Sequence, residues 1–352
     1  KIQYFGGKTQ AVEKNTRVKA RVKAHALKEF MNTKEKVVVM GHRLPDADSF
    51  GAAIGIYRAA KTLNKKAYIV IDNPTSSIIP LMNTFSDNQD YEADMFVNNH
   101  EAKEIMDDNT LLVVVDTNKP SITQCEDLLY MAKMIVVLDH HRQGSDTIRN
   151  SVLSYIEPYA SSASEMVAEI LQYFTEGIRI RNVEADSIYA GIMIDTDNFM
   201  QKTGVRTFEA AAFLRRCGAD VTRVRKLFRE DMNDYKARGE TIRNAELFRG
   251  QFAISECPSD YVDSPTVVGA QAANELLNIV GVKASFVLTE YKGVIYISAR
   301  AIDEVNVQII MERMGGGGHL NMAGCQLETV DLEGARSLLK STLTEMQDGG
   351  EI

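Results

Sequence analysis

The chain has 352 residues, of which 45% are hydrophobic, and its 40 Lys and Arg against 48 Asp and Glu give a formal net charge of −8. The length allows two domains with separate cores, and the hydrophobic fraction is ordinary for a globular protein. A net negative chain attracts a polyanion only through local cationic or metal charge, which argues against a long nucleic acid duplex as a partner.

The four cysteines lie far apart and form no paired ligand motif; they are Cys125, Cys217, Cys257 and Cys325. We expect them to be reduced, which suits a reducing compartment and argues against a thiolate zinc site. No apolar run reaches the length of a membrane span. The sequence starts at Lys1 instead of a methionine, so we expect it to be an excised part of a longer protein.

A basic, helix-prone segment opens the chain over residues 9–35, and we interpret residues 1–35 as a leading helix or linker. Its expected apolar face contains Val18, Val22, Ala26 and Phe30, whose spacings are compatible with one side of a helix.

Apolar runs that favour strands then alternate with helical patterns. Strands are predicted at residues 36–40, 67–71, 110–115 and 134–138, with helices that include residues 49–63 and 99–107. This alternation implies crossover connections, and therefore an α/β domain with a parallel sheet and helices on both faces. Asp48 or Ser49 is well placed to cap the helix after the first strand.

The following region is mostly helical and then changes to strands. Helices are predicted at residues 161–174, 183–195, 207–217, 221–231 and 233–247, and strands near residues 251–256, 284–291 and 293–300. Residues 291–294 predict a hairpin turn. We place the domain boundary inside the charged helix, with a catalytic domain at 36–232, a linker helix at 233–249 and a smaller α/β domain with a mixed sheet at 250–352.

Six metal-ligand side chains follow or end apolar runs: His42, Asp46, Asp48, Asp116, His140 and Asp195. The carboxyl ends of parallel strands meet at one edge of a sheet, so residues far apart in sequence can converge there. His42 to Asp48 alone could be a capping turn with a solvent-facing histidine. The full set favours a metal centre, because several buried carboxylates would otherwise cost several kcal/mol.

The kind of ligand indicates the kind of metal and chemistry. Oxygen and nitrogen ligands without thiolate favour Mn²⁺ or Mg²⁺, while imidazole leaves Fe, Co and Zn possible. Two ions about 3.5–4 Å apart can lower the pKa of a water molecule and clamp a phosphoryl group. The expected reaction is metal-assisted phosphoester hydrolysis with two divalent ions, Mn²⁺ being the expected metal.

A glycine run, Gly315 to Gly318, is followed directly by His319. Consecutive glycines let the backbone approach a ligand and turn its N–H groups towards an anion, although a flexible turn is the alternative. Arg300, upstream, could supply bidentate phosphate contacts.

These motifs resemble, in order, those of the DHH phosphoesterase superfamily: residues 37–51, 116–118, 139–141 and 190–197, with residues 297–324 resembling the DHH-associated C-terminal domain. The resemblance implies that His42, Asp46 and Asp116 hold one manganese. It implies that Asp48, Asp116, His140 and Asp195 hold the other, so that Asp116 bridges the two ions.

The resemblance also implies roles beyond the metal ligands. His141 would face the substrate phosphate, unless it only orients its neighbours. The substrate contacts would be Arg300, the glycine loop, His319 and Asn118, which could instead be a turn-forming residue; the loop glycines concerned are Gly316, Gly317 and Gly318. The two domains would face each other across a cleft. Residues 161–164 could touch phosphate at a helix N-terminus, though capping explains them too.

The whole chain, including residues 4–9 and the basic leader, resembles the catalytic portion of membrane-anchored cyclic-di-AMP phosphodiesterases of the GdpP (YybT) type. This implies hydrolysis of cyclic-di-AMP to linear pApA by a cytoplasmic part of a bacterial membrane protein, with a homodimer possible. One alternative is an oligonucleotide phosphatase or exonuclease acting on pApA or short RNA. Another is a catalytically silent nucleotide-sensing module. The preference for adenine rests on the resemblance alone.

Overall fold

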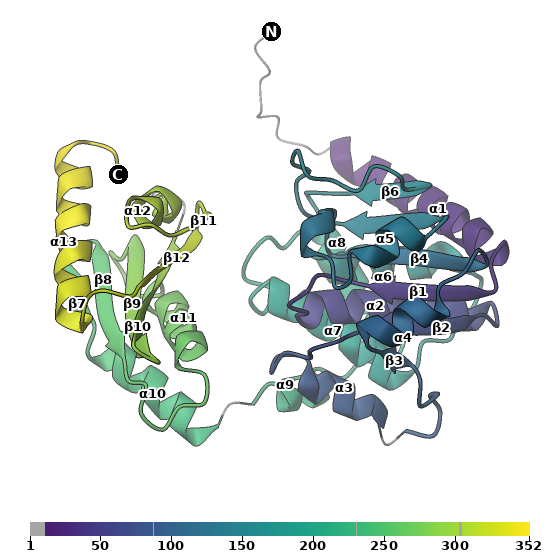
Figure 1. Ribbon diagram of the computed structural model, residues 1–352, viewed down its shortest axis with the longest axis horizontal. Coiled ribbons are helices and arrows are strands. Elements are labelled where there is room, and N and C mark those ends of the chain that lie inside the picture. The colour runs from purple at the N-terminus through teal and green to yellow at the C-terminus, as the bar shows by residue number, and fades with distance from the viewer. Residues whose placement is uncertain (1–10, 87, 230, 303–304) are drawn as a thin grey trace, which may run out of the picture. The chain divides into compact units, whose positions relative to one another are not determined.

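The chain divides into two compact units, Lys1–Arg229 and Glu230–Ile352, each built on its own sheet (Figure 1). The computed structural model describes residues 11–86, 88–229, 231–302 and 305–352, so residues 4–9 lie outside the described part. Within the described residues, no helix combines the length and the apolar character that crossing a bilayer requires.

The division between the units falls before the charged helix instead of inside it. That helix is α10 (Met232–Arg243), and it packs on α11 (Pro265–Leu276) and β8 (Phe252–Cys257) of the second unit. Ala237 on α10 belongs to the second unit's core, which is why the whole helix lies with that unit.

The first unit contains a six-stranded parallel sheet in the order β3-β2-β1-β4-β5-β6. The strands are β1 (Lys36–Met40), β2 (Lys66–Val70), β3 (Phe96–Val97), β4 (Thr110–Val115), β5 (Ile135–Asp139) and β6 (Leu153–Ile156). The four central strands confirm the predicted runs, whereas the short edge strands β3 and β6 were not predicted. The strand order reverses between β1 and β4, which is where ligands bind in open α/β sheets.

Helices cover both faces of this sheet, as predicted. The helices in the described part of this unit are α1 (Ala11–Asn32), α2 (Ala47–Thr62), α3 (Ile79–Ser86), α4 (Asn99–Ile105), α5 (Asp127–Met131), α6 (Ala163–Phe174), α7 (Asn182–Asp195), α8 (Val205–Arg216) and α9 (Val221–Leu227), of which α8 and α9 pack on other helices. Side chains alternate along β1, so Val37 and Val39 join the core beneath α1, α2, α6 and α7. Val38 and Met40 join a second core beneath α4 and α5.

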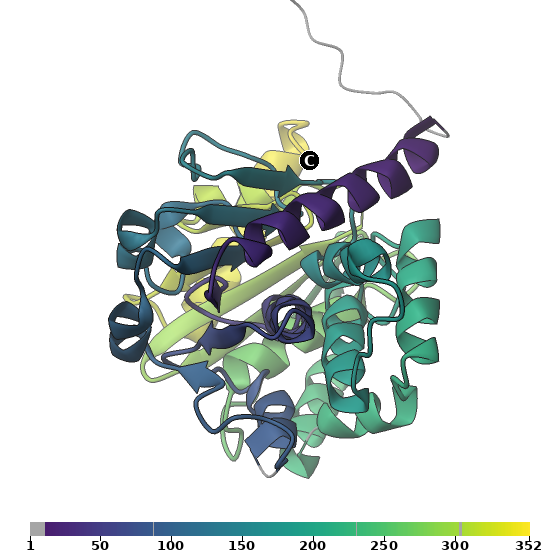
Figure 2. The same ribbon diagram turned by 90° about the vertical axis from the view of Figure 1, so that its right-hand side faces the viewer.

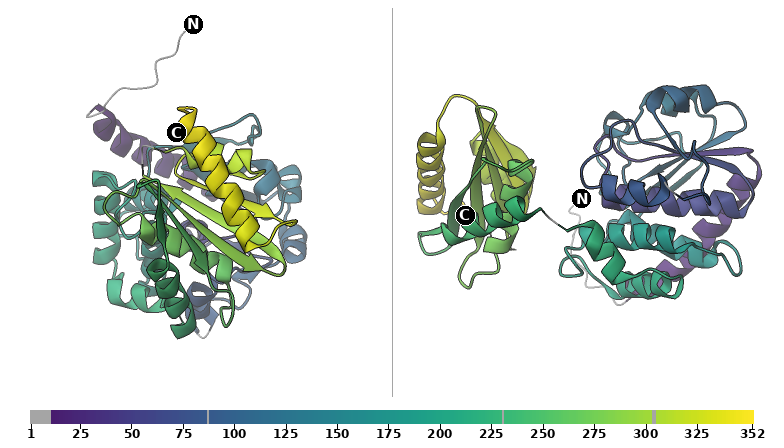
Figure 3. Two further views of the ribbon diagram at one scale, coloured as in Figure 1. Left: turned by 90° about the vertical axis from the view of Figure 1, so that its left-hand side faces the viewer. Right: turned by 90° about the horizontal axis from the view of Figure 1, so that it is seen from below.

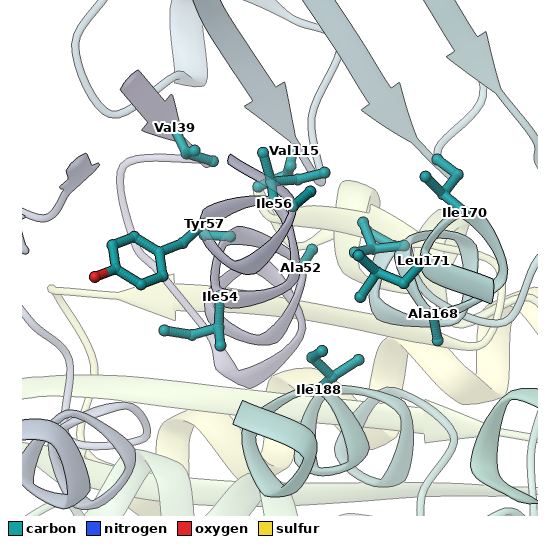
Figure 4. Packing of buried hydrophobic residues seen from close by; sticks show 14 of the residues in the cluster. Val39, Ala52, Ile54, Ile56, Tyr57, Val115, Ala168, Ile170, Leu171 and Ile188 are labelled. Atoms are coloured by element: carbon teal, nitrogen blue, oxygen red, sulfur yellow. The ribbon is translucent and has the colours of Figure 1, made fainter. Parts of the chain in front are cut away.

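Helix α2 is buried among β1, β4, α6 and α7 (Figure 4). Ile54 and Ile56 on this helix are fully buried, and the labelled side chains around them come from all of these elements. A helix that is apolar on nearly every side belongs in a core. Its first turn is therefore fixed in position where it carries two of the predicted metal ligands, Asp46 at the cap and Asp48.

The expected apolar face of the leading helix is wrong for its two valines. Helix α1 lies along α6 and contacts β6 (Figure 2), burying Ala20, Ala24, Leu27 and Met31. Of the four residues expected on that face, Val18 and Val22 are 62% and 59% exposed, and Ala26 and Phe30 are partly buried. The small alanines allow the close approach of α1 to α6. With the alanine side of the helix buried, the valines face solvent.

The second unit confirms the predicted mixed sheet, in the order β11-β12-β10-β9-β8-β7, with β8 and β9 parallel and the other pairs antiparallel. Its remaining elements are β7 (Glu246–Phe248), β9 (Ala284–Tyr291), β10 (Val294–Ala301), β11 (Gly317–His319), β12 (Met322–Leu327), α12 (Val307–Arg313) and α13 (Leu332–Asp348). Helices α12 and α13 cover one face (Figure 3), and α10 and α11 cover the other. The predicted hairpin turn joins β9 to β10, with positive φ at Lys292 and Gly293.

The corrected face of α1 can be tested by two substitutions on that helix. We expect Leu27→Ala to lower the free energy of unfolding of the first unit by about 2–5 kcal/mol, because it leaves a cavity against α6. Val22→Ala, its matched control, should change it by less than about 0.5 kcal/mol, since the valine is exposed. Urea unfolding followed by circular dichroism measures both, and equal losses would contradict the observed packing.

Candidate metal centre

The loop after β1 and the first turn of α2 bring His42, Asp46 and Asp48 to the sheet edge at the switch point. Asp46 is the N-cap of α2, with an extended backbone and a carboxylate that accepts from Ser49 N at 2.9 Å. The expected cap, Asp48 or Ser49, is therefore wrong. Asp48 instead lies within the first helical turn, where its buried carboxylate accepts from Ala163 N and Ser164 N.

One group of potential ligands surrounds His42. Its Nε2 lies 3.5 Å from Asp46 Oδ2 and 3.3 Å from Asp116 Oδ2. The loop after β1 supplies two of these side chains and the end of β4 supplies the third. Their ligand atoms are mutually close enough to hold one metal ion.

A second group surrounds His140, which follows β5. Its Nε2 lies 3.3 Å from Asp116 Oδ1, 3.8 Å from Asp48 Oδ2 and 3.8 Å from Asp195 Oδ2. Asp195 is the last residue of α7. Since one oxygen of Asp116 faces His42 and the other faces His140, this carboxylate joins the two groups. The structure thus brings all six sequence-predicted ligands together.

Asp116 has an unusual backbone. Its φ is 59°, in the left-handed region that non-glycine residues seldom adopt, and its amide donates to Leu138 O at 2.9 Å. The residue is 3% exposed. Such a conformation costs free energy and persists where the surrounding structure holds it, often at functional sites. Here it places the carboxylate between the two histidines.

The donor set fits divalent cations. Asp116 Oδ1 and Asp195 Oδ2 are buried carboxylate oxygens without a hydrogen-bond donor in the described part of the chain. Buried charges need a counter-charge or a metal, because desolvation is costly. The oxygen and imidazole ligands present are those that hard or borderline divalent ions prefer.

The ionisable groups of the cluster shift one another's pKa values strongly. Burial, together with the negative charges of Asp116 and Asp195, raises the pKa of Asp48 well above its usual range. Burial also acts against the charged form of Asp116, but the imidazoles of His140 and His42 lower its pKa to about 2. The carboxylates in turn overcome the burial of both histidines, raising the pKa of His42 to about 10 and that of His140 to about 9. The buried carboxylates repel one another, and a bound cation would relieve this repulsion.

His141 is held by a carboxylate that the sequence reasoning missed. Asp139 is fully buried, and it accepts from His141 Nδ1 at 2.8 Å and from His141 N at 3.1 Å. The imidazole is half exposed, so its Nε2 is the nitrogen left for other contacts. The position of Asp139 directly before the two histidines, at the end of a predicted strand, was the available signal.

Asn118 lies beneath this pair and not at the surface. It is 2% exposed, and its amide donates to Asp139 and to His141 O, the latter at 3.3 Å. Its contacts are therefore with the group that orients His141. Among residues 161–164, Ser162 caps α6, as the alternative predicted, and the amides of Ala163 and Ser164 donate to Asp48. A contact of these residues with phosphate stays a prediction.

In the second unit, three strands bring the predicted substrate residues into one row. Arg300 on β10 pairs with Met322 on β12, which pairs with His319 on β11. The His319 side chain lies outside the described part. The Arg300 guanidinium is largely buried, which lowers its pKa, and its Nε has no hydrogen-bond partner in the described residues.

Two of the loop glycines are required by packing. A Cβ on Gly316 would lie 2.1 Å from Gly324 O, and one on Gly318 would lie 2.5 Å from Met322 O. Gly317 has open space at the same position. The glycines at 316 and 318 therefore let β11 approach β12 closely, and the substrate contact of Gly317 stays a prediction. The expected cleft between the domains stays a prediction.

Comparisons with known proteins show the family to which the chain belongs. The sequence profile of the DHH family N-terminal domain matches residues 36–192, and that of the DHHA1 domain matches residues 252–345. The cyclic-di-AMP phosphodiesterase GdpP of Bacillus subtilis is 43% identical over 99% of this chain and 54% of that protein. This chain thus spans about half the length of the curated relatives that match it at 40–43% identity.

Two more distant proteins are similar to this chain over most of its length, one in sequence and one in fold. The bifunctional oligoribonuclease and PAP phosphatase NrnA of Thermus thermophilus is 26% identical over 90% of this chain and 92% of that protein. An exopolyphosphatase-related protein from Bacteroides fragilis has a solved structure with a TM-score of 0.78 and 20% identity, covering 93% of this chain and 97% of that one. The structural likeness establishes the fold.

Metal binding should be visible as a gain in thermal stability. A ligand present at 100 times its Kd stabilises the folded state by about 2.7 kcal/mol, so saturating Mn²⁺ should raise the Tm of the first unit by about 5–10 °C relative to EDTA. Asp116→Asn should lose this rise, because both groups share Asp116. Asp107→Asn, an acid that pairs with Lys36 at the opposite end of β1, should keep it. A rise retained by Asp116→Asn would contradict the proposed site.

Proposed function

We propose, from the premise that this chain belongs to the DHH family, that it hydrolyses cyclic-di-AMP to linear pApA. The observation that carries the proposal is the convergence of six side chains with nitrogen or oxygen ligand atoms in two groups, which Asp116 joins. The substrate follows from the 43% identity to a cyclic-di-AMP phosphodiesterase over nearly the whole chain. From its likeness to this relative, we further propose that the chain is the cytoplasmic part of a membrane-anchored protein.

Two Mn²⁺ ions are the proposed cofactor. His42, Asp46 and Asp116 would hold one ion, while Asp48, Asp116, His140 and Asp195 would hold the other. The two oxygens of Asp116 face different histidines, which supports a bridging role. When bound, two such ions lower the pKa of a water molecule and neutralise the charge of a phosphoryl group.

His141 is the proposed contact to the phosphate under attack. Asp139 holds Nδ1 of His141, which leaves Nε2 to donate to a phosphate oxygen or a leaving oxygen. A carboxylate in this position fixes the ring orientation and the tautomer of an imidazole. The Asn118 amide donates a hydrogen bond to Asp139. We therefore assign Asn118 a positioning role in place of direct substrate contact.

The second unit is proposed to hold the distal part of the dinucleotide. A largely buried guanidinium without an acidic partner in the described residues is suited to a phosphate, which can accept from two of its N–H groups. The open backbone at Gly317 and the neighbouring His319 extend this surface. The two units would then bind different parts of one substrate.

An oligonucleotide phosphatase acting on pApA or short RNA is the second candidate. It is supported by the 26% identity to an oligoribonuclease and PAP phosphatase that is matched over nearly its whole length. The same metal ligands and glycine loop would serve that reaction. The intact ligand set argues against a catalytically silent sensing module.

Product analysis separates these candidates. We expect Mn²⁺-dependent conversion of cyclic-di-AMP to pApA, with slower turnover of cyclic-di-GMP, pApA and short RNA. Chromatography of the products measures the turnover of each substrate. Asp116→Ala and His140→Ala should abolish turnover while the circular dichroism spectrum stays unchanged. Faster release of mononucleotides from pApA or RNA would favour the second candidate, and no turnover of any substrate with Mn²⁺ would favour the silent module.

The role of the second unit can be tested through KM. We expect Arg300→Met and His319→Ala to raise KM by about 10-fold or more, since each removes a charge-assisted or polar contact to phosphate, with a smaller effect on kcat. Arg313→Met is a matched control, because Arg313 is a surface residue of α12 that pairs with Glu351. Unaltered KM in the first two variants would reject the proposed binding surface.

A further inference from the structure

Three helices meet directly behind Asp48, and Ser164 lies at their junction. Ser164 is in the first turn of α6 and is fully buried. It faces Gly51 of α2 and Gly191 of α7. A Cβ on Gly51 would lie 2.7 Å from Ser164 Oγ, and a Cβ on Gly191 would lie 2.2 Å from it. The serine hydroxyl thus fills the space that the two glycines leave.

Ser164 holds Asp48 by both its main chain and its side chain. Ser164 N donates to Asp48 Oδ1 at 2.8 Å, and Ser164 Oγ donates to Asp48 O at 3.0 Å. Ala163 N donates to Asp48 Oδ2 at 2.7 Å. The exposed N–H groups of a helix N-terminus favour a carboxylate at this place. As a result, the Asp48 carboxylate has one fixed orientation, with Oδ2 also facing His140.

The first turn of α6 is itself anchored by a buried carboxylate. Glu165 is 1% exposed, and it accepts from Ser161 Oγ at 2.5 Å and from Thr207 Oγ1 at 2.6 Å. Its own amide donates to the cap residue Ser162 at 3.0 Å. Because Thr207 belongs to α8, the turn that holds Asp48 is tied to a further helix and cannot shift alone.

Ser164 also lies beside the helix that carries Asp195. Gly191 is four residues before Asp195, so it lies one turn earlier on α7. A Cβ on Gly191 would lie 2.9 Å from Ala47 O, which shows how closely α7 approaches the start of α2. The separation of Asp48 and Asp195 therefore depends on the contact that Ser164 makes with both helices.

We propose that Ser164 is a positioning residue, which orients Asp48 and sets its separation from Asp195 so that both can share one cation with His140. This inference rests on the metal centre of the proposed function. Side chains that orient metal ligands commonly affect metal affinity by 10–100-fold when they are replaced. A serine that only fills space would affect stability and leave the metal affinity unchanged.

The test compares Ser164→Ala with Ser187→Ala in the full chain. Ser187 is an equally buried serine of the first unit, and its hydroxyl donates to Val183 O at 2.8 Å within α7. Both variants lose one buried hydroxyl and one hydrogen bond to a carbonyl. Calorimetric titration with Mn²⁺ should give a Kd about 10–100-fold higher for Ser164→Ala. Ser187→Ala should stay within about twofold of the unsubstituted chain, and urea unfolding in EDTA should show similar losses for both variants.

The possible outcomes separate this inference from the proposal beneath it. Failure of the unsubstituted chain to bind Mn²⁺ would reject the metal centre itself. Mn²⁺ binding with equal Kd in the unsubstituted chain and Ser164→Ala would overturn only the role of Ser164. Should Ser164→Ala not fold, Ser164→Cys keeps a side chain of similar shape with a weak donor. Its Kd for Mn²⁺ should also rise, and an unchanged value would overturn the inference.

Discussion

The repulsion among buried carboxylates at the switch point of the sheet is the constraint on which the rest of the site depends. Asp48, Asp116 and Asp195 all face His140 within 4 Å, and they raise its pKa to about 9. The described residues leave two of these carboxylate oxygens without donors. Such an arrangement is favourable only if positive charge enters it, which is why we regard cation binding as its purpose.

The fold keeps these charges together by several independent restraints. Parallel pairing of β1, β4 and β5 brings three chain segments to one edge. The positive φ of Asp116 turns its carboxylate between two histidines, and the first turn of α6 fixes Asp48. Asp139 similarly fixes His141. The positive φ of Asp116 costs free energy, and the tightly packed core around α2 supplies the rigidity that maintains it.

Local patterns in the sequence predicted the features that depend on neighbouring residues. Buried parallel strands give continuous apolar runs, so β1, β2, β4 and β5 were predictable, and so were the acids and histidines that follow them. The two-residue strand β3 leaves no comparable run. The buried side of α1 depends on its packing against α6, and the hydrogen bonds to Asp48 join residues more than 100 positions apart. No local pattern carries information about such contacts.

We propose that Asp116 joins two cation sites. The most direct measurement is the anomalous diffraction of a crystal grown with Mn²⁺, recorded at the manganese absorption edge. We predict two peaks, one on each side of the Asp116 carboxylate, the first beside His42 and the second beside His140. An absence of peaks at Asp116 in a crystal that contains manganese, or peaks only elsewhere on the chain, would contradict the account.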